Sequence, residues 1–358
     1  MLLRVLDTLA RKLIAGAIAL AAILALAWRG CASRSGTAAR EDRDEDRDED
    51  RDHDRDRDGD RDDDAELERV REQVRRHRPA PAPGRWLDVV APAFTVAPGT
   101  RDAYCFTTHL PNPEPLAIRR WRSSMSGGIR DIVVFLGPSA QAQAPEVRRA
   151  PCDRLVEPRP SEAIAYISHA PTDDLELPPN DGAGHPVGQL AEPGALLVVE
   201  MQIMNPTERE LPARLDLHIE AADRRLEVTP MSSVIAFQRQ LRIPPGTAAS
   251  PGTLTIAGSC AVPASVKLFG VSSYTHQLGV HTFVWDGSAR LFDSTGWDHP
   301  ETQAWWTGYL LKSGSLQYGC EYRNPTPRPV ALGALPDAEL CVIVGYVFPA
   351  PRPILCPN

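Results

Sequence analysis

The 358-residue sequence has very few lysines and few aromatic side chains, and both shortages narrow the possible functions. Lys12, Lys267 and Lys312 are the only lysines, and phenylalanine, tryptophan and tyrosine make up 6% of the chain. A nucleic-acid partner is not expected, because the sequence has no cluster of Lys and Arg that would neutralise phosphates. The 34 prolines and 25 glycines favour short strands and many turns.

Several catalytic and metal-binding motifs are also missing. No Cys-x-x-Cys pair occurs, so neither a zinc ribbon nor a redox dithiol is predicted. The sequence contains no Gly-x-Ser-x-Gly elbow, P-loop or His-Glu-x-x-His motif. Paired carboxylates such as Asp173-Asp174 are present, but a glycosidase needs two carboxyl groups that face each other across a cleft, which sequence cannot show.

The N-terminal part is non-globular in character. Residues 1–30 carry basic side chains followed by an apolar run from Leu13 to Trp28, which predicts a signal peptide or an N-terminal membrane anchor. Any membrane contact is expected through this segment alone. Cys31 raises the alternative of lipidation, although Trp28-Arg29-Gly30 is a poor lipobox.

Residues 31–84 are predicted to form a disordered, low-complexity stalk. Residues 41–64 hold sixteen Asp or Glu and six Arg, so the net charge of −8 comes from this run and the remaining chain is close to neutral. A segment without apolar side chains cannot build a core. The sequence PAPAPG at 79–84 stiffens the chain and ends the stalk.

From residue 85 onward, short apolar runs alternate with turn signals, and no long amphipathic helix is predicted. This pattern predicts an all-β fold of two tandem antiparallel β-sandwich domains with a jelly-roll-like arrangement, at 85–230 and 231–358. The stretch 226–243 is interpreted as the passage between them. The runs expected to be strands are 132–136, 196–201, 214–219, 266–271, 282–285 and 341–348.

Six of the seven cysteines lie in this globular part, which is an even number. An oxidising compartment would allow them to pair. The sequence therefore predicts an exported protein that is either secreted or anchored to the cell envelope by its N-terminal apolar segment.

Specific motifs appear late in the chain. They read SSYTHQLG at 272–279, GSLQYGCEYRN at 314–324 and DAELC at 337–341. These segments resemble the C-terminal domain of the copper type II ascorbate-dependent monooxygenases, the family of peptidylglycine and dopamine hydroxylases. The family has two β-sandwich domains and uses two copper ions to hydroxylate an aliphatic carbon with oxygen and a reductant such as ascorbate.

The first half of the globular part resembles the same family more weakly. Tyr104-Cys105 followed by Leu110-Pro111 resembles its opening strand, and 128–137 resembles the strand that bears a His-His pair. Residues 196–206 resemble a segment that ends in a His-Tyr-Asn motif. The resemblance covers roughly residues 100–356.

The resemblance also implies a pairing of the cysteines. Cys320 with Cys341 and Cys260 with Cys356 match two bridges of the family, which leaves Cys105 and Cys152 to pair with each other or to stay apart. The two matched bridges would close loops of 21 and 96 residues. In the chain-entropy model, each would stabilise the fold by roughly 3–5 kcal/mol.

Most copper ligands that the resemblance implies are replaced. In the second domain, Tyr274 and His276 occupy the two positions of the His-x-His segment, and Leu340 occupies the position of a Met ligand. His276 is the only retained ligand. A repaired copper site that uses His281, or Tyr274 as a phenolate, is an alternative.

In the first domain, Arg130-Asp131 occupies the positions of the His-His pair, and Gln202 or Ile203 that of a later His. An Arg side chain stays protonated and repels a copper ion. Other histidines that could substitute as ligands are His109, His169, His185 and His218.

The expected function is therefore a binding or structural role in a non-catalytic member of the family, with no cofactor and with an unknown protein or small molecule as partner. The alternative is an active copper- and ascorbate-dependent monooxygenase. A further alternative is a ligand- or carbohydrate-binding surface formed by aromatic side chains that would otherwise pack under the sandwich edge, namely Trp297, Trp305, Trp306 and Tyr309.

Overall fold

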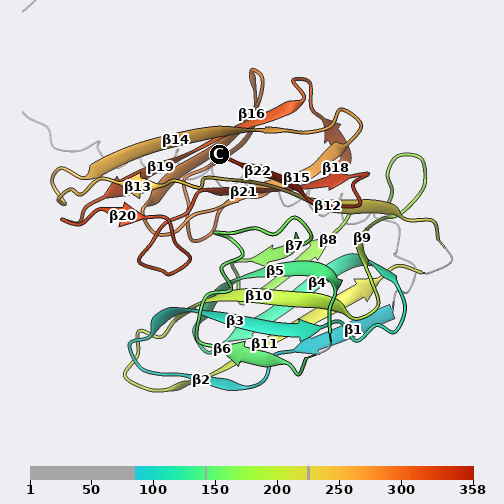
Figure 1. Cartoon of the computed structure of the whole chain (residues 1–358), viewed down its shortest axis with the longest axis horizontal. Helices are drawn as coiled ribbons and strands as arrows, with labels where there is room; N and C mark the ends of the chain where they lie inside the picture. The colour runs from blue at the N-terminus through green and yellow to red at the C-terminus, as the bar shows by residue number, and fades with distance from the viewer. Residues whose placement is uncertain (1–84, 142, 224–225) are drawn as a thin grey trace, which may run out of the picture. The chain divides into compact units, whose positions relative to one another are not determined.

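The computed structural model describes residues 85–141, 143–223 and 226–358. All regular secondary structure in these ranges is β, in 22 strands, and most neighbouring strands pair antiparallel (Figure 1). The predicted all-β fold of two tandem sandwiches is confirmed. The predicted leader and stalk, residues 1–84, lie outside the described residues. None of the described residues belongs to a helix that could span a membrane.

The first sandwich consists of two facing sheets. We call them the β11 sheet and the β10 sheet, after a central strand of each. The β11 sheet runs in the order β1 (Arg85–Val90), β11 (Leu211–Ala221), β4 (Leu116–Ser126) and β9 (Val187–Ala191), with β2 (Phe94–Val96) beside β11 and β8 (Thr172–Glu176) beside β4. The β10 sheet runs in the order β6 (Glu146–Arg148), β3 (Arg101–His109), β10 (Ala195–Met204), β5 (Ile129–Ser139) and β7 (Ala163–Ser168).

The second sandwich also has two sheets, the β21 sheet and the β19 sheet. The β21 sheet contains β12 (Thr229–Phe237), β21 (Val342–Phe348), β15 (Lys267–Tyr274) and β18 (Gln303–Leu310), with β22 (Ile354–Pro357) parallel to β12. The β19 sheet contains β14 (Gly252–Ala261), β19 (Ser315–Asn324), β16 (Gly279–Asp286) and β17 (Ala289–Ser294). The short strands β13 (Arg242–Ile243) and β20 (Val330–Ala331) form a separate pair.

The segment interpreted as a passage between the domains contains strand β12, which runs from the first sandwich to the second and joins the β11 and β21 sheets into one 11-stranded sheet. The first residues of β12, Thr229 to Met231, pair parallel with β9 of the first sandwich, and the later residues pair with β21. The sequence MSSVIAF is fully buried, so it forms part of a sheet rather than an exposed linker.

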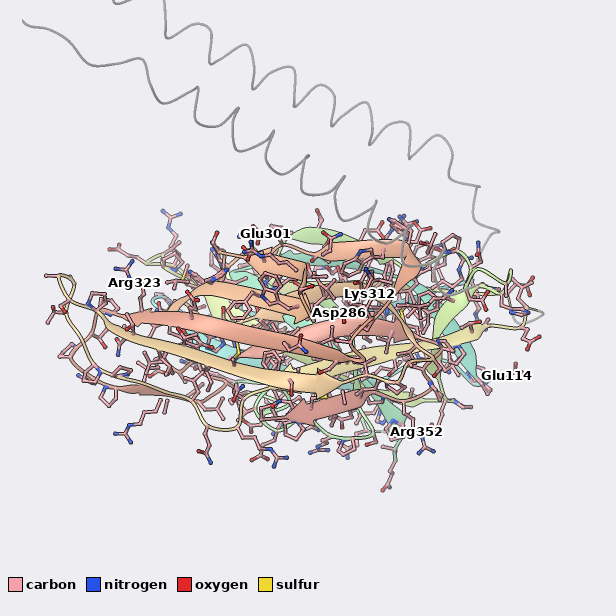
Figure 2. All side chains as sticks on the ribbon, turned by 90° about the horizontal axis from the view of Figure 1, so that it is seen from above. Glu114, Asp286, Glu301, Lys312, Arg323 and Arg352 are labelled. Carbon is pink, nitrogen blue, oxygen red and sulfur yellow. A yellow bond between two sulfur atoms is a disulfide. The ribbon has the colours of Figure 1, made fainter. Side chains whose placement is uncertain are left out.

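A shared apolar layer joins the two sandwiches. On β5, Ile132 and Val134 enter the core of the first sandwich, whereas Val133 and Phe135 point the other way. These two pack in one cluster with β12 and β21, whose own alternate residues fill the second core. A strand buried on both faces needs apolar residues at every position, which explains the continuous run IVVFL. The exposed charges, for example Arg323 and Arg352, lie on the outside of the molecule (Figure 2).

Three disulfides close the globular part. They join Cys260 to Cys356 and Cys320 to Cys341, the two pairs that the resemblance implies, and Cys105 to Cys152, for which the sequence analysis left two alternatives. Such bridges persist in an oxidising environment and are rare in a reducing one.

Each sandwich also contains the same Asn-Pro-Thr turn. Asn205 and Asn324 are fully buried, and each donates through Nδ2 to a backbone carbonyl four residues later and to one of a distant loop. Each also accepts the backbone N–H and the hydroxyl of the Thr two residues on. In both sandwiches, the same set of Asn hydrogen bonds therefore holds the end of the strand that precedes this turn.

Candidate functional site

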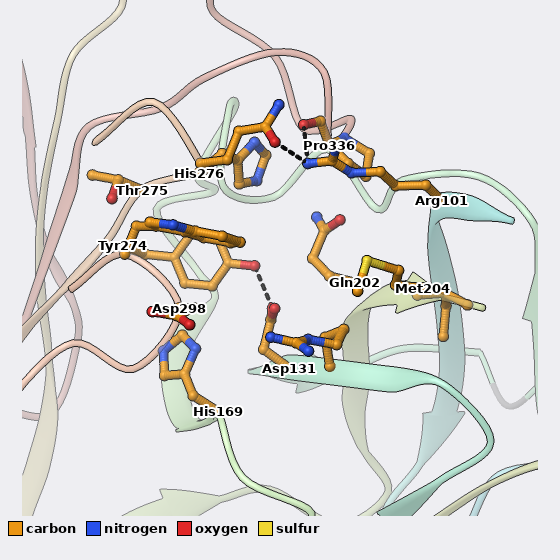
Figure 3. A pocket seen from close by; sticks show the side chains of 14 residues that line it. Arg101, Asp131, His169, Gln202, Met204, Tyr274, Thr275, His276, Asp298 and Pro336 are labelled. Atoms are coloured by element: carbon orange, nitrogen blue, oxygen red, sulfur yellow. Dashed lines mark hydrogen bonds between the residues drawn. The ribbon is translucent and has the colours of Figure 1, made fainter. Parts of the chain in front are cut away.

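A pocket of about 220 Å³ lies where the two sandwiches meet (Figure 3). Its first-sandwich wall comes from the start of β3, the start of β5 and the end of β10. Its second-sandwich wall comes from the end of β15 and the turn after it. Polar side chains of both walls line the pocket, among them Asp131 and Gln202 of the first sandwich and Tyr274 and His276 of the second.

Strand alternation explains why these polar side chains face the second sandwich. Asp131 and Val133 share one face of β5, and Val198, Glu200 and Gln202 share one face of β10. Because Val133 and Val198 belong to the shared apolar layer, the polar positions extend the same face toward its edge. Asp131 and Gln202 are direct cross-strand partners. The pocket is therefore the polar end of the layer that joins the sandwiches.

The pocket gathers positions that the sequence analysis took from both domains. Arg130, Asp131 and Gln202 of the first domain line it together with Tyr274 and His276 of the second. Ile203, the alternative to Gln202, lines it as well. Leu340 does not, because it is fully buried among Val342, Tyr274 and other members of the shared layer.

A hydrogen bond across the two sandwiches defines one side of the pocket. The Tyr274 hydroxyl donates to Asp131 Oδ1 at 2.5 Å. Burial raises the pKa of Asp131 to about 7, against the opposing effects of the Tyr274 hydrogen bond and the Arg130 charge. Burial, followed by the nearby Asp131 charge, raises the pKa of Tyr274 well above its ordinary value. A Tyr274 phenolate, one form of the repaired copper site, is therefore disfavoured.

Glu200 lies next to this pair and was not singled out from the sequence. It is 1% exposed, and neither carboxylate oxygen has a hydrogen-bond partner. Burial raises the pKa of Glu200 to about 8, and the charges of Asp153 and Asp131 act in the same direction. The signal in the sequence is a lone acid inside the apolar run LLVVEM. The interface therefore contains two carboxyl groups whose pKa values burial raises to neutral pH or slightly above.

His276 is fixed by its own backbone and by one ring nitrogen. Its backbone N–H and that of Leu278 donate to the two oxygens of the buried Glu339 carboxyl group, whose pKa burial raises to about 7. The ring Nδ1 lies 2.9 Å from the Ala338 carbonyl oxygen, so Nδ1 must hold the proton. Burial lowers the pKa of His276, more than the carbonyls of Ala338 and Leu335 raise it. The ring is therefore neutral.

Three buried side-chain atoms of residues that line this pocket have no hydrogen-bond partner: His169 Nε2, His276 Nε2 and Gln202 Oε1. The last two are acceptors. His276 Nε2 keeps its lone pair because the proton is on Nδ1, and Gln202 Oε1 is free because Gln202 Nε2 donates to the Ala334 carbonyl oxygen. The His276 ring and the Gln202 amide face the same space, beside the Tyr274–Asp131 hydrogen bond (Figure 3). The pocket thus presents free acceptors to a bound molecule.

The other candidate histidines lie in different surroundings. His169 lines the pocket, and burial lowers its pKa to about 4. His281 lies on β16, in the β19 sheet, where its ring nitrogens contact Asp293 at 3.1 Å and Glu321 at 3.5 Å. Three more lie outside the pocket: His109 beside Gln143, His185 beside Asp181, and His218 beside Asp88.

The donor atoms of the pocket do not fit a copper ion. A copper site needs several nitrogen or sulfur donors around one point. The Tyr274 ring lies between two imidazoles, with centroids 6.0 Å from His276 and 5.7 Å from His169. Leu340 offers no donor atom, and within residues 85–358, gaps aside, no three His, Cys, Asp or Glu side chains gather in a metal-binding group. His281, the repair candidate, does not line the pocket.

The aromatic cluster divides in two. Trp305 and Tyr309 pack against the core of the second sandwich, as expected for residues under a sandwich edge. Trp297 lines the pocket and is 38% exposed, and Trp306 is exposed at 43% with its edge against Phe269. One member of the cluster is thus placed where a ligand could contact it.

No protein-family model and no curated protein matches the sequence. Among solved structures, the chain is similar to PNGase F, described as a glycosylasparaginase from Flavobacterium meningosepticum, with a TM-score of 0.35 and 9% identity over 76% of this chain and 98% of that one. It is also similar to a peptide-N(4)-(N-acetyl-beta-D-glucosaminyl) asparagine amidase, with a TM-score of 0.33 and 9% identity over 75% and 98% of the two chains. Similarity at this level shows no shared activity.

Proposed function

We propose that this protein is an exported, non-catalytic relative of the copper type II ascorbate-dependent monooxygenases that binds a small molecule in the pocket between its two sandwiches. The observation that carries the proposal is the pair of buried, unpartnered acceptors, His276 Nε2 and Gln202 Oε1, which face one cavity. The family part rests on the motifs at 272–279, 314–324 and 337–341.

The energetic argument concerns the two free acceptors. A buried polar atom without a hydrogen bond costs about 1–3 kcal/mol. A bound molecule that supplies the missing partners recovers this free energy, whereas a purely structural interface would be more stable with apolar side chains here. Small-molecule sites combine apolar walls with a few convergent polar groups, as this pocket does through Ile203, Met204 and its central polar set.

The non-catalytic part of the proposal rests on the donor set. The family chemistry needs two copper ions, and in this chain Arg130, Asp131, Gln202, Tyr274 and Leu340 stand at the ligand positions. The proposed protein therefore uses no cofactor. The three disulfides favour an oxidising compartment, and the apolar N-terminal segment favours secretion or anchoring to the cell envelope.

A ligand-observed NMR screen tests the binding role. The probes are small polyols, amines and carboxylates, offered to the full-length protein. We expect at least one to bind the wild type and to lose about tenfold in affinity in Gln202→Leu, which removes one free acceptor at nearly constant size. Gln303→Leu, on the exposed edge strand β18, is the matched control and should bind like the wild type. The proposal fails if no probe binds, or if Gln202→Leu binds every probe unchanged.

The active copper monooxygenase remains the second candidate, and one observation favours it. His276, the retained ligand position, has an unprotonated and unpartnered Nε2, which is the form of imidazole that binds a metal. Copper content measured after incubation with copper and dialysis separates the two candidates. Two tightly bound ions per chain would overturn the non-catalytic proposal.

A further inference from the structure

The hydrogen-bonding character of the pocket restricts its ligand. Nδ1 of His276 already donates to a backbone carbonyl, so this ring offers only the Nε2 lone pair. Gln202 donates one Nε2 hydrogen to the Ala334 carbonyl oxygen, and its unpartnered buried atom is the acceptor Oε1. The Tyr274 proton is used by Asp131, which leaves the phenol oxygen as an acceptor as well. The unpartnered atoms of His276 and Gln202 at the centre of the pocket are therefore both hydrogen-bond acceptors. A complementary ligand must be a donor at two or more positions.

The charges around the pocket favour a neutral ligand. Arg101 and Arg130 line the pocket together with Asp298 and Asp131, and the pKa of about 7 leaves Asp131 partly ionised at neutral pH, so these four side chains carry a net charge between zero and +1. Arg101 donates to Gln277 Oε1 at 2.7 Å and to the Pro336 carbonyl oxygen, which holds its positive charge at this wall. His276 and His169 are neutral for the reasons given above. A cationic amine would lose water next to two arginines, and an anion would face the lone pairs of His276 Nε2 and Gln202 Oε1.

The walls favour a ring with an apolar face. Ile203 and Met204 form part of the first-sandwich wall, and the Trp297 side chain lines the opposite part while remaining 38% exposed. An aromatic side chain that is half open at the mouth of a pocket can receive the C–H face of a ring. Sugars and cyclitols combine such a face with several hydroxyl donors.

We propose that the pocket takes a neutral hydroxyl-bearing ring, a sugar or a cyclitol, whose hydroxyl groups donate to His276 Nε2 and Gln202 Oε1 and whose apolar face lies against Trp297. This inference rests on the proposed binding function and names its ligand class. It is independent of copper, because it uses the lone pairs of His276 and Gln202 for hydrogen bonds.

Isothermal titration calorimetry on the full-length protein tests this ligand class. The probes are the methyl glycosides of glucose, galactose, mannose and N-acetylglucosamine, together with myo-inositol. We expect at least one to bind. Its mono-O-methyl derivatives keep every oxygen acceptor but remove one donor each, so at least one of them should bind about tenfold more weakly. Equal affinity for all O-methyl derivatives would overturn the assignment, because the ring would then not act as a donor.

Variants of pocket residues test whether the sugar or cyclitol binds in this pocket. Gln202→Leu and Trp297→Ala should each weaken binding of the sugar by about tenfold or more. Trp86→Ala, an exposed tryptophan on β1 of the first sandwich, is the matched control and should bind like the wild type. Circular dichroism and thermal unfolding establish that each variant is folded. Unchanged binding in both pocket variants would overturn the assignment.

A separate arm distinguishes this inference from the proposed function. Ethylammonium and choline are the cationic probes, and acetate and inorganic phosphate the anionic ones. If one of these binds with a loss in Gln202→Leu while no sugar or cyclitol binds, the pocket is a ligand site and the neutral-ring assignment is wrong. If nothing binds at all, both proposals fail.

Discussion

At the scale of single residues, the least expected feature is a buried acid without a partner. Glu200 lies in the shared layer between the sandwiches beside Asp131, and burial raises the pKa values of both carboxyl groups, to about 8 and about 7. A solvated Glu releases its proton near pH 4. The interface is therefore most stable when both groups are protonated.

Replacing Glu200 tests this statement through the pH dependence of stability. Between about pH 4 and pH 8 the folded protein holds a proton on Glu200 that the unfolded chain has released, so wild-type stability falls as the pH rises through this window. Glu200→Gln cannot ionise. We expect its advantage in unfolding free energy over the wild type to grow by up to roughly 1.4 kcal/mol per pH unit and to level off above about pH 8.

Urea denaturation at pH 4, 6, 8 and 9 measures this difference. Glu210→Gln, an exposed position, is the control and should match the wild-type unfolding free energy throughout. A constant difference between Glu200→Gln and the wild type at all four pH values would show that Glu200 does not titrate in this window.

At the scale of elements, the sequence predicts the positions of the strands better than it predicts how the strand ends are held. The runs at 132–136 and 196–201 form the middle of β5 and β10, as predicted, because apolar residues at every position suit strands buried on both faces. The Asn-Pro-Thr turns are different. Asn205 and Asn324 look like ordinary turn residues in the sequence, and their burial depends on distant loops at Val96 and Pro244 that only the folded chain brings near.

We expect replacement of either buried Asn to lower the unfolding free energy by a similar amount. Asn205→Ala and Asn324→Ala each leave at least two carbonyl oxygens and one N–H without their partner, so each variant should lose about 1–3 kcal/mol of unfolding free energy. Asn180→Ala is the control, because Asn180 is exposed and accepts a hydrogen bond from Gly182 N. Chemical denaturation measures all three. Losses as small as that of Asn180→Ala would show that the buried turns are not stabilising.

At the scale of the whole molecule, the disulfides differ in how much chain each one closes. Cys260–Cys356 spans 96 residues and ties the last strand to the second sandwich, whereas Cys320–Cys341 spans 21. In the chain-entropy model, removing the longer bridge costs about 4–5 kcal/mol and removing the shorter one about 3 kcal/mol.

Variants that lack one disulfide each, with both of its cysteines replaced by Ala, test which of the two bridges stabilises the protein more. Cys260→Ala with Cys356→Ala should unfold at a lower urea concentration than Cys320→Ala with Cys341→Ala. Cys260, Cys320 and Cys341 are buried in the core of the second sandwich and the partly buried Cys356 packs against it, so each variant removes sulfurs from the same core and serves as a control for the other. The reverse order would mean that local packing, rather than loop closure, dominates the stabilisation.

The sequence by itself determined the all-β class and the main strands, and the resemblance of its motifs implied two of the three cysteine pairs. These features follow from local patterns: the apolar runs, the turn residues and the motifs around the cysteines. Tertiary structure alone decided the pocket. Asp131 and Tyr274 lie 143 positions apart, and their hydrogen bond exists only because the outward face of the β10 sheet packs on the β21 sheet. No local pattern encodes that contact, since each strand shows only which residues alternate and not which sheet will cover them.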